Sequence, residues 1–471
     1  MDKRYKFLLS NTGLFFISTF SSKFLVFLLM PLYTRVLSQE EFNTVDLVTQ
    51  AANLLLPMVS LGIANSIIRF GLDRKYSKRG VFTISALVYA GGFVVFGLCY
   101  PVISKVTYVA EYIFYLYLYV ICSCLRTLVQ QFARARTYTR LYAVDGIMAT
   151  VNTLRLMYIF LTKLHMGPRG YILATIGADF ISFLFLSLIS GCWHSFDLSA
   201  AKPALAGEML RYCLPLIPTG IFWWITNVSD RFLVTSIVGG AIGGLYGISY
   251  KIPSIVNLFS TVFTEAWQIS AVKEGQHEHP EIFFKSVFRA YQGIVFMAAA
   301  GLILLCRIIV SIMTAAHFYE SWRFIPVLII ATVFSCFSAF LSSIYMVQKN
   351  GKSNLLTMMA GAISNIALNL VMIPKWGAQG AAIATLISYG LVFVLRVIGT
   401  KKFINIDISV SFMALNTGLT LALAACMVNE IKYWIPVCTF ITAVIVALNI
   451  MPLYRFAISL LHSLTGKKKH I

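Results

Sequence analysis

About fourteen long apolar runs follow one another through almost the whole chain, each about 17–25 residues long. A run of that length forms a helix that crosses the hydrocarbon core of a bilayer. Of the 471 residues, 59% are hydrophobic and 12% are charged, whereas a soluble domain carries about 25% charged residues. The sequence therefore predicts an all-α polytopic membrane protein and excludes a secreted or cytosolic globular protein.

The basic residues give this chain an orientation. Its formal net charge is +20, from 38 Lys and Arg against 18 Asp and Glu. If both termini are cytoplasmic, most of these cations fall on the inner side, including Lys3, Arg4, Lys6 and the terminal run 467–469, as the positive-inside rule requires. One missed or wrongly assigned helix would break the alternation of basic and less basic segments. An assignment of twelve spans would therefore need two such errors whose effects cancel. The first apolar run is too long for a signal peptide, so we expect it to be retained as a membrane-spanning helix. The basic residues of the predicted inner segments are interpreted as topology signals rather than as a surface that binds nucleic acid.

Motifs of catalysis and metal binding are incomplete. Gly351-Lys352-Ser353 resembles the end of a phosphate-binding loop, but Met346 stands where that motif needs glycine. The sequence His277-Glu278-His279-Pro280 has the wrong spacing for a helical zinc site, and the nine cysteines form no CxxC pair. The predicted loops are too short for a catalytic domain. We expect no cofactor or metal, and a transporter driven by an ion gradient or by its substrate's own gradient.

Five cations lie inside the predicted spans and are the candidate ligand-binding residues. Lys23, Arg155 and Lys251 lie toward the middle of their helices, where a charge is costly unless it faces a partner or water. Arg126 and Arg307 lie nearer helix ends, where snorkelling is the simpler interpretation. Because these cations outnumber central acids, we predict a water-filled cavity that favours an anion, with phosphate the first candidate.

The acids within or beside the spans are candidate charge partners or ion-coupling groups. Asp179 lies well inside its span and is the expected partner of Arg155; such a pair could also do no more than join two helices. The other acids lie nearer the span boundaries and are expected to be interface groups or partners of nearby cations. They include Asp46, Asp145, Asp230 and Glu265.

A weak internal repeat suggests two halves of like orientation. The segment 22–26 resembles 230–234, and 42–54 then aligns with 246–258 after a four-residue difference in length. Such a parallel repeat places a central cavity between the halves. The predicted organisation is an N-terminal lobe over residues 1-208, a C-terminal lobe over 209-405, and two additional helices with a basic cytoplasmic tail over 406-471.

Several short patterns make the chain similar to a known family. They are Ser22-Lys23, Pro31-Leu32-Tyr33-Thr34-Arg35, Phe42 to Asp46-Leu47, Leu61-Gly62, Arg69-Phe70, Ser229-Asp230-Arg231-Phe232, Tyr246-Gly247 to Tyr250-Lys251-Ile252-Pro253, Ala266-Trp267 and the glycine-alanine run 377–382. With them the chain resembles the Wzx-type polysaccharide flippases, the O-antigen and capsule repeat-unit branch of the multidrug/oligosaccharidyl-lipid/polysaccharide exporter superfamily. Asn43 departs from the pattern, since that branch usually has glycine there.

The resemblance implies a fold and an activity. It implies two six-helix lobes around a cavity, two additional helices, and flipping of an undecaprenyl-diphosphate-linked oligosaccharide across the bacterial cytoplasmic (inner) membrane. It also implies alternating access coupled to H⁺ or Na⁺, with membrane lipid and polysaccharide assembly proteins as further partners. Lys23 and Lys251, at related positions of the two lobes, suit a diphosphate.

Three alternatives stay open. A multidrug or cation antiporter of the same superfamily should have a dominant acidic site, and the surplus of central cations argues against it. A lipid-linked peptidoglycan precursor flippase differs only in substrate. A membrane glycosyltransferase, polysaccharide polymerase or ligase generally needs a sizeable outer loop, and the predicted outer loops are short.

Overall fold

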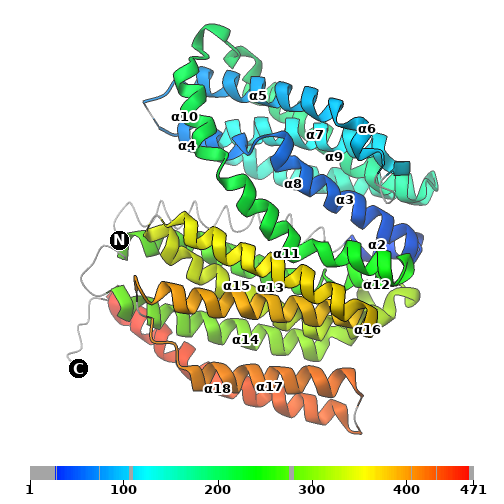
Figure 1. The fold of residues 1–471 in the computed structure, drawn as a ribbon, viewed down its shortest axis with the longest axis vertical. Coiled ribbons are helices and arrows are strands. Elements are labelled where there is room, and N and C mark those ends of the chain that lie inside the picture. Colours follow the sequence, from blue (N-terminus) through cyan, green and yellow to red (C-terminus); the bar gives the residue numbers. More distant parts are fainter. Residues whose placement is uncertain are drawn as a thin grey trace. The chain divides into compact units, whose positions relative to one another are not determined.

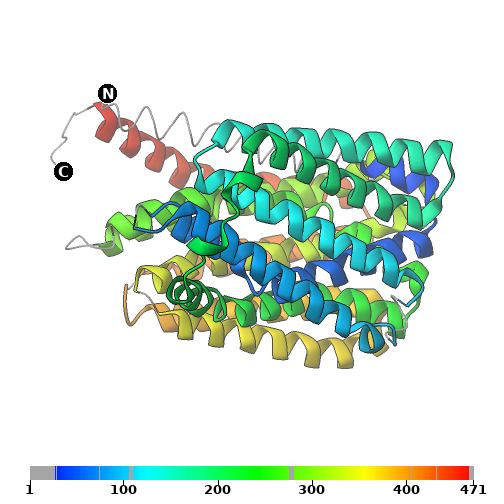
Figure 2. The ribbon, with the colours of Figure 1, turned by 90° about the horizontal axis from the view of Figure 1, so that it is seen from above.

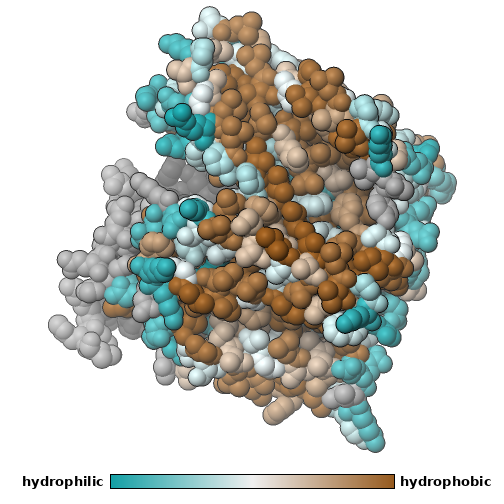
Figure 3. Space-filling model, in the orientation of Figure 1, coloured by the Kyte–Doolittle hydropathy of each residue, from teal (hydrophilic) through white to brown (hydrophobic). Residues whose placement is uncertain are grey.

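The computed structural model describes residues 27, 29–73, 75–105, 110–274, 280–348, 350–404, 406–430 and 432–465. Every regular element in these ranges is helical, as the sequence predicts (Figure 1). Lys23 and most of the first predicted span lie outside the described residues. Apolar side chains cover the flanks of the helices and hydrophilic ones gather toward their ends (Figure 3), as expected for helices that cross a bilayer.

The elements of the first part of the chain are mostly long helices joined by short turns. They are α2 (Met30–Val36), α3 (Gln39–Val59), α4 (Ile63–Gly71), α5 (Lys78–Leu98), α6 (Tyr100–Ile103), η1 (Ala110–Tyr112), α7 (Ile113–Ala135), α8 (Thr139–Met157), the π-helix η2 (Tyr158–Lys163), α9 (Gly167–Ser190), η3 (Cys192–Ser195), η4 (Leu198–Ala200) and α10 (Pro203–Cys213).

The second part has the same character. Its elements are α11 (Leu216–Ile237), α12 (Gly240–Ser249), α13 (Pro253–Glu274), α14 (Pro280–Met313), η5 (Ala316–Arg323), α15 (Ile325–Val347), α16 (Gly351–Thr400), α17 (Val410–Val428) and α18 (Trp434–Thr465). The 50-residue α16 is two helices in succession, because Gly377 breaks it with φ 57° and ψ −143°. A positive φ of this kind is readily adopted only by glycine.

Within the described ranges, nine helices are long and apolar enough to cross a membrane, or ten if the bent pair α3 and α4 is one span. The angle within that pair is 54°. Helices α11 and α13, with 22 residues each, are long enough but less apolar than those nine. The expected number of fourteen spans therefore stays a prediction.

The chain divides into two compact units. Unit 1 comprises residues 1–224 with 240–244 and 313–315, and unit 2 comprises 225–239, 245–312 and 316–471. The chain first passes from one unit to the other inside α11. The lobe boundaries expected from the sequence stay a prediction.

Unit 1 is organised around α7, α8 and α9, which pack on one another, with α3 against α7 and α9 (Figure 2 views the molecule from above). A capping box starts α3: Ser38 Oγ accepts from the backbone N–H of Glu41 at 3.2 Å, and the Glu41 carboxylate accepts from the N–H of Ser38 at 2.8 Å. This exchange satisfies two backbone donors that the helix start leaves without partners.

Unit 2 has α15 at its centre, packed against α13, both parts of α16 and α17. Aromatic rings fill the space between α13, α14 and α15: the Trp267 and Phe340 centroids lie 4.7 Å apart, and those of Phe263 and Tyr291 lie 4.3 Å apart. Helices α17 and α18 pack on each other as a hairpin. The sequence pattern explains this core, since α15 is apolar on nearly all sides.

Two adjacent glycines of α5 give a matched test of this packing. A Cβ on Gly92 would lie 1.9 Å from the carbonyl oxygen of Val59, whereas a Cβ on Gly91 would meet no atom within 4 Å. We expect Gly92→Ala to lower the free energy of unfolding by about 1–3 kcal/mol, because α5 must move away from α3. Gly91→Ala should leave it unchanged or raise it. Thermal unfolding in detergent measures both, and equal melting temperatures would contradict the close approach.

Candidate functional site

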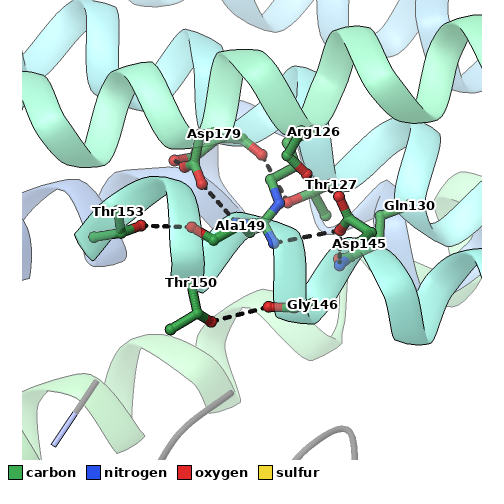
Figure 4. A network of polar contacts seen from close by, with 11 residues as sticks. Arg126, Thr127, Gln130, Asp145, Gly146, Ala149, Thr150, Thr153 and Asp179 are labelled. Carbon is green, nitrogen blue, oxygen red and sulfur yellow. Dashed lines mark hydrogen bonds and ion pairs between the residues drawn. The ribbon is translucent and has the colours of Figure 1, made fainter. Parts of the chain in front are cut away.

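A buried ion-pair network joins three helices of unit 1 (Figure 4). Arg126 of α7 extends toward two carboxylates: its Nη1 lies 2.7 Å from Asp179 Oδ1 on α9, and its Nη2 lies 3.4 Å from Asp145 Oδ2 on α8. The Asp145 side chain is fully buried, that of Asp179 is 11% exposed and that of Arg126 is 23% exposed. One arginine thus binds two acidic residues.

Neutral side chains complete the hydrogen bonding of the two acids. Ser123 Oγ donates to Asp179, and Ser182 Oγ donates to Asp145. Gln130 Nε2 donates to Asp145 at 3.1 Å. Spacings of three or four residues place these groups on one face of each helix, which is why helices α7 and α9 can each contribute two or more of them.

The expected pair of Arg155 with Asp179 is wrong, because Asp179 binds Arg126 instead. The face of α8 that carries Asp145 packs inward, whereas Arg155 lies on the exposed face of that helix. Arg155 has no ion-pair partner within the part of the chain that the structure describes. The sequence analysis placed Asp145 near a span boundary, whereas it lies inside this network. The sequence signal for the network is the spacing of Ser123, Arg126 and Gln130, which places the three polar side chains on one face of α7.

A second buried polar network lies in unit 2, around Asp230 of α11. This residue is 0% exposed, and its Oδ2 accepts from the hydroxyls of Tyr246 at 2.8 Å, of Thr385 at 3.1 Å and of Tyr250. The other carboxylate oxygen, Oδ1, is buried and has no hydrogen-bond partner among the described residues. Since buried polar atoms are nearly always paired, this oxygen is a candidate acceptor for a further donor.

Two asparagines of α16 extend this network. Asn365 Nδ2 donates to Thr385 Oγ1 at 3.3 Å, and Asn369 Nδ2 donates to Asn365 Oδ1 at 2.9 Å. Both asparagines are 0% exposed. The Oδ1 atom of Asn369 is a further buried acceptor without a donor in the described part of the chain. The network therefore offers oxygen atoms of carboxylate, amide and hydroxyl type, which can hold a hard cation or a proton.

Arg307 of α14 is enclosed by aromatic rings. Its guanidinium carbon lies 3.6 Å from the ring centroid of Trp322 and 4.4 Å from that of Trp434, and its Nη2 bonds the carboxylate of Glu430. Glu430 and Trp434 flank the turn between α17 and α18. These contacts attach the hairpin to α14.

The remaining predicted residues are less fully described. Lys251 is half-buried at the turn between α12 and α13, directly before the helix start at Pro253. Asp46 is buried in α3 at 5% exposure. Glu265 lies in α13, but its side chain is outside the described set, as is the whole of Lys23. No cluster of three or more His, Cys, Asp or Glu that could hold a metal ion occurs among the described residues.

Comparison with known proteins assigns this arrangement to a family. Residues 8–268 match the family described as polysaccharide biosynthesis protein. The chain belongs to that family. A curated relative, an uncharacterized membrane protein of Methanocaldococcus jannaschii, is 24% identical over 265 residues, which are 52% of this chain and 61% of that protein.

Solved structures show the fold of this polysaccharide biosynthesis protein. The lipid II flippase MurJ in an inward closed conformation is similar at TM-score 0.68 and 12% identity, covering 96% of this chain and all of that one. An inward-facing multidrug resistance MATE family transporter of the MOP superfamily is similar at TM-score 0.65 and 14% identity, covering 81% and 95%. The predicted all-α, multi-pass membrane fold is thereby confirmed.

Removing Arg126 tests how the unit 1 network is balanced. We expect Arg126→Leu to lower the free energy of unfolding by about 3 kcal/mol, because it leaves two buried carboxylates without their cation. Adding Asp145→Asn and Asp179→Asn to that variant should restore most of the loss. Thermal unfolding of the purified variants measures this, and an unchanged melting temperature for the single variant would refute the assignment.

Proposed function

We propose that this protein is a flippase that moves an undecaprenyl-diphosphate-linked oligosaccharide repeat unit from the inner to the outer leaflet of a bacterial cytoplasmic membrane. The observation that carries the proposal is that a chain of the polysaccharide biosynthesis family has the fold of membrane transporters and a lipid flippase. The family and these neighbours are transporters and not enzymes, so the polysaccharide role is transport of a lipid-linked intermediate. Both termini are cytoplasmic in this proposal, and assembly proteins of the polymer receive the product.

Cations within or beside the predicted spans are the proposed ligands of the diphosphate. Arg155, exposed on α8, and Lys251, at the break before α13, are the described candidates, and Lys23 is the third from the sequence. Arg126 and Arg307 were candidates too, but acids already bind both. We therefore assign those two a structural role.

Ion coupling centres on Asp230. Its carboxylate is fully buried, and one of its oxygens lacks a donor among the residues that the structure describes. Binding H⁺ or Na⁺ there would neutralise a charge in a medium of low dielectric constant and so change the packing preferences of α11 and α16. Asp179 is already neutralised in part by Arg126, and this favours Asp230 as the coupling group.

A second candidate substrate is a lipid-linked peptidoglycan precursor. The observation that favours it is the similarity to MurJ over nearly the whole chain. A cation antiporter has a fold neighbour as well, but the surplus of cations in the spans counts against it. Purified protein in liposomes separates these functions when it is offered an undecaprenyl-diphosphate oligosaccharide, lipid II and an organic cation in turn. Failure to move the first, with transport of either of the others, would refute the proposal.

The cationic residues give the next prediction. We expect Arg155→Gln and Lys251→Gln each to lower the initial rate of translocation in liposomes by about tenfold, because each removes a charge-assisted contact to phosphate. Arg169→Gln is the control, since Arg169 pairs with Glu111 in an exposed position. An undiminished rate in both test variants would contradict the assignment.

The buried carboxylate of Asp230 gives a prediction about ion coupling. The wild-type rate should respond to an imposed Na⁺ or pH gradient, and Asp230→Asn should abolish that response because the amide can neither ionise nor neutralise a cation. Asp407→Asn is the matched control, as Asp407 is exposed and bonds Lys285 at 2.5 Å. A variant at position 230 that still follows the gradient would remove Asp230 from the coupling mechanism.

A further inference from the structure

Helix α13 carries a stripe of uncharged polar side chains along one face. The members recur every three or four residues, which places them above one another on a helix. They are Ser254, Asn257, Thr261, Thr264 and Gln268. The stripe extends over about 21 Å at 1.5 Å per residue, more than half of the thickness of a hydrocarbon core.

An adjoining face of α13 forms part of the core of unit 2. Its members are Val256, Ser260, Trp267 and Ala271, all 5% exposed or less, as is Ile252 directly before the helix. On the stripe itself, Ser254, Asn257 and Thr261 are exposed, and Thr264 and Gln268 are half-buried. Leu258, at the edge of the stripe, is buried and bounds it on one side. Ser254 and Thr261 thus point away from the protein core, whereas the exposed Asn257 also accepts from Sγ of the buried Cys336 of α15 at 3.9 Å.

A helix in a bilayer does not turn such a face to lipid. Hydroxyl and amide groups in hydrocarbon have no water to bond, so a polar face on a spanning helix indicates a water-filled passage. The lower apolarity of α13 relative to the nine candidate spans agrees with this. The hydroxyls of Ser254 and Thr261 donate to backbone carbonyls at 2.5 and 2.8 Å, and their lone pairs remain available to accept. Thr264 Oγ1 is a buried atom without a hydrogen-bond partner among the described residues, so the accessible part of the stripe is formed by the other four members.

The chemistry of the stripe differs from that of the cation beside it. Lys251 precedes Ser254 by three residues and suits a phosphate, whereas neutral hydroxyls and amides are the groups that bond sugar hydroxyls. We propose that this stripe is the surface that binds the saccharide part of the substrate, with Lys251 at its end for the diphosphate. The inference rests on the proposed flippase function and adds to it the residues that bind the saccharide.

The internal repeat supplies independent support. Aligning 42–54 with 246–258 places Gln50 and Asn53 of α3 at the positions of Ser254 and Asn257. In unit 1, Asn53 is exposed, and its Nδ2 donates to Gln50 Oε1 at 3.3 Å. The corresponding helices of the two halves therefore both present an amide or hydroxyl pair at the same repeat position.

The test compares two substrates that differ only in their glycan. Proteoliposomes holding the full chain receive undecaprenyl diphosphate bearing either a tetrasaccharide or a single sugar, and translocation is followed for each. The test variant combines Asn257→Leu, Thr261→Val and Gln268→Met, which keep side-chain size and remove hydrogen bonding. The control is Phe259→Leu, an exposed residue of the same helix that lies off the stripe. Melting temperatures of all variants are measured in parallel.

We expect the triple variant to lower the tetrasaccharide rate by about tenfold and to leave the single-sugar rate within about twofold of the wild type. Phe259→Leu should leave both rates unchanged. Equal rates for the triple variant and the wild type would overturn the inference, and so would an equal loss on both substrates. If the wild-type protein moves neither substrate, the proposed function itself fails and the inference falls with it.

Discussion

The energetic penalty for a charge without water governs the interior of this protein. A bilayer leaves each ionic group a choice between a protein partner, an aqueous cavity and the membrane surface. Arg126 takes the first solution, with Asp145 and Asp179 from two neighbouring helices. Such a network fixes which helices are neighbours, because removing one member strands the others. The packing of α7, α8 and α9 and the polar architecture of unit 1 depend on it.

Unit 2 solves the same problem differently. Asp230 accepts from neutral hydroxyls, and its Oδ1 has no donor within the described part of the chain. A fully paired charge is a fixed structural element, whereas an incompletely bonded one can change its state by taking up a ligand. Asp179 and Asp230 are thus buried acids of different character, and this difference underlies our proposal that Asp230 is the coupling group.

The helical membrane fold could be predicted from the sequence because it follows from the length and composition of apolar runs, which are local properties. The site could be predicted only in part. Arg155 and Lys251 were identified as costly residues, since cost depends on depth in a helix, whereas Asp230 was expected to be a boundary acid and is fully buried. The ion-pair partner of a residue depends on how each helix is rotated about its axis, and the position of a residue along its helix does not give this rotation. For that reason Asp179 was paired with Arg155 instead of Arg126. The double contact of Arg307 with Trp322 and Trp434 had no sequence signal, because the rings come from distant segments.

The enclosure of Arg307 also bears on how firmly the last helical hairpin is attached. Glu430 and Trp434 contact the guanidinium from the hairpin, and Trp322 of η5 contacts it from another segment of the chain. If α17 and α18 moved away from α14, Arg307 would keep the Trp322 ring and lose its acid. Since a charge without a partner is costly in a bilayer, this cost opposes the separation, and a cation thus holds the hairpin in addition to apolar packing.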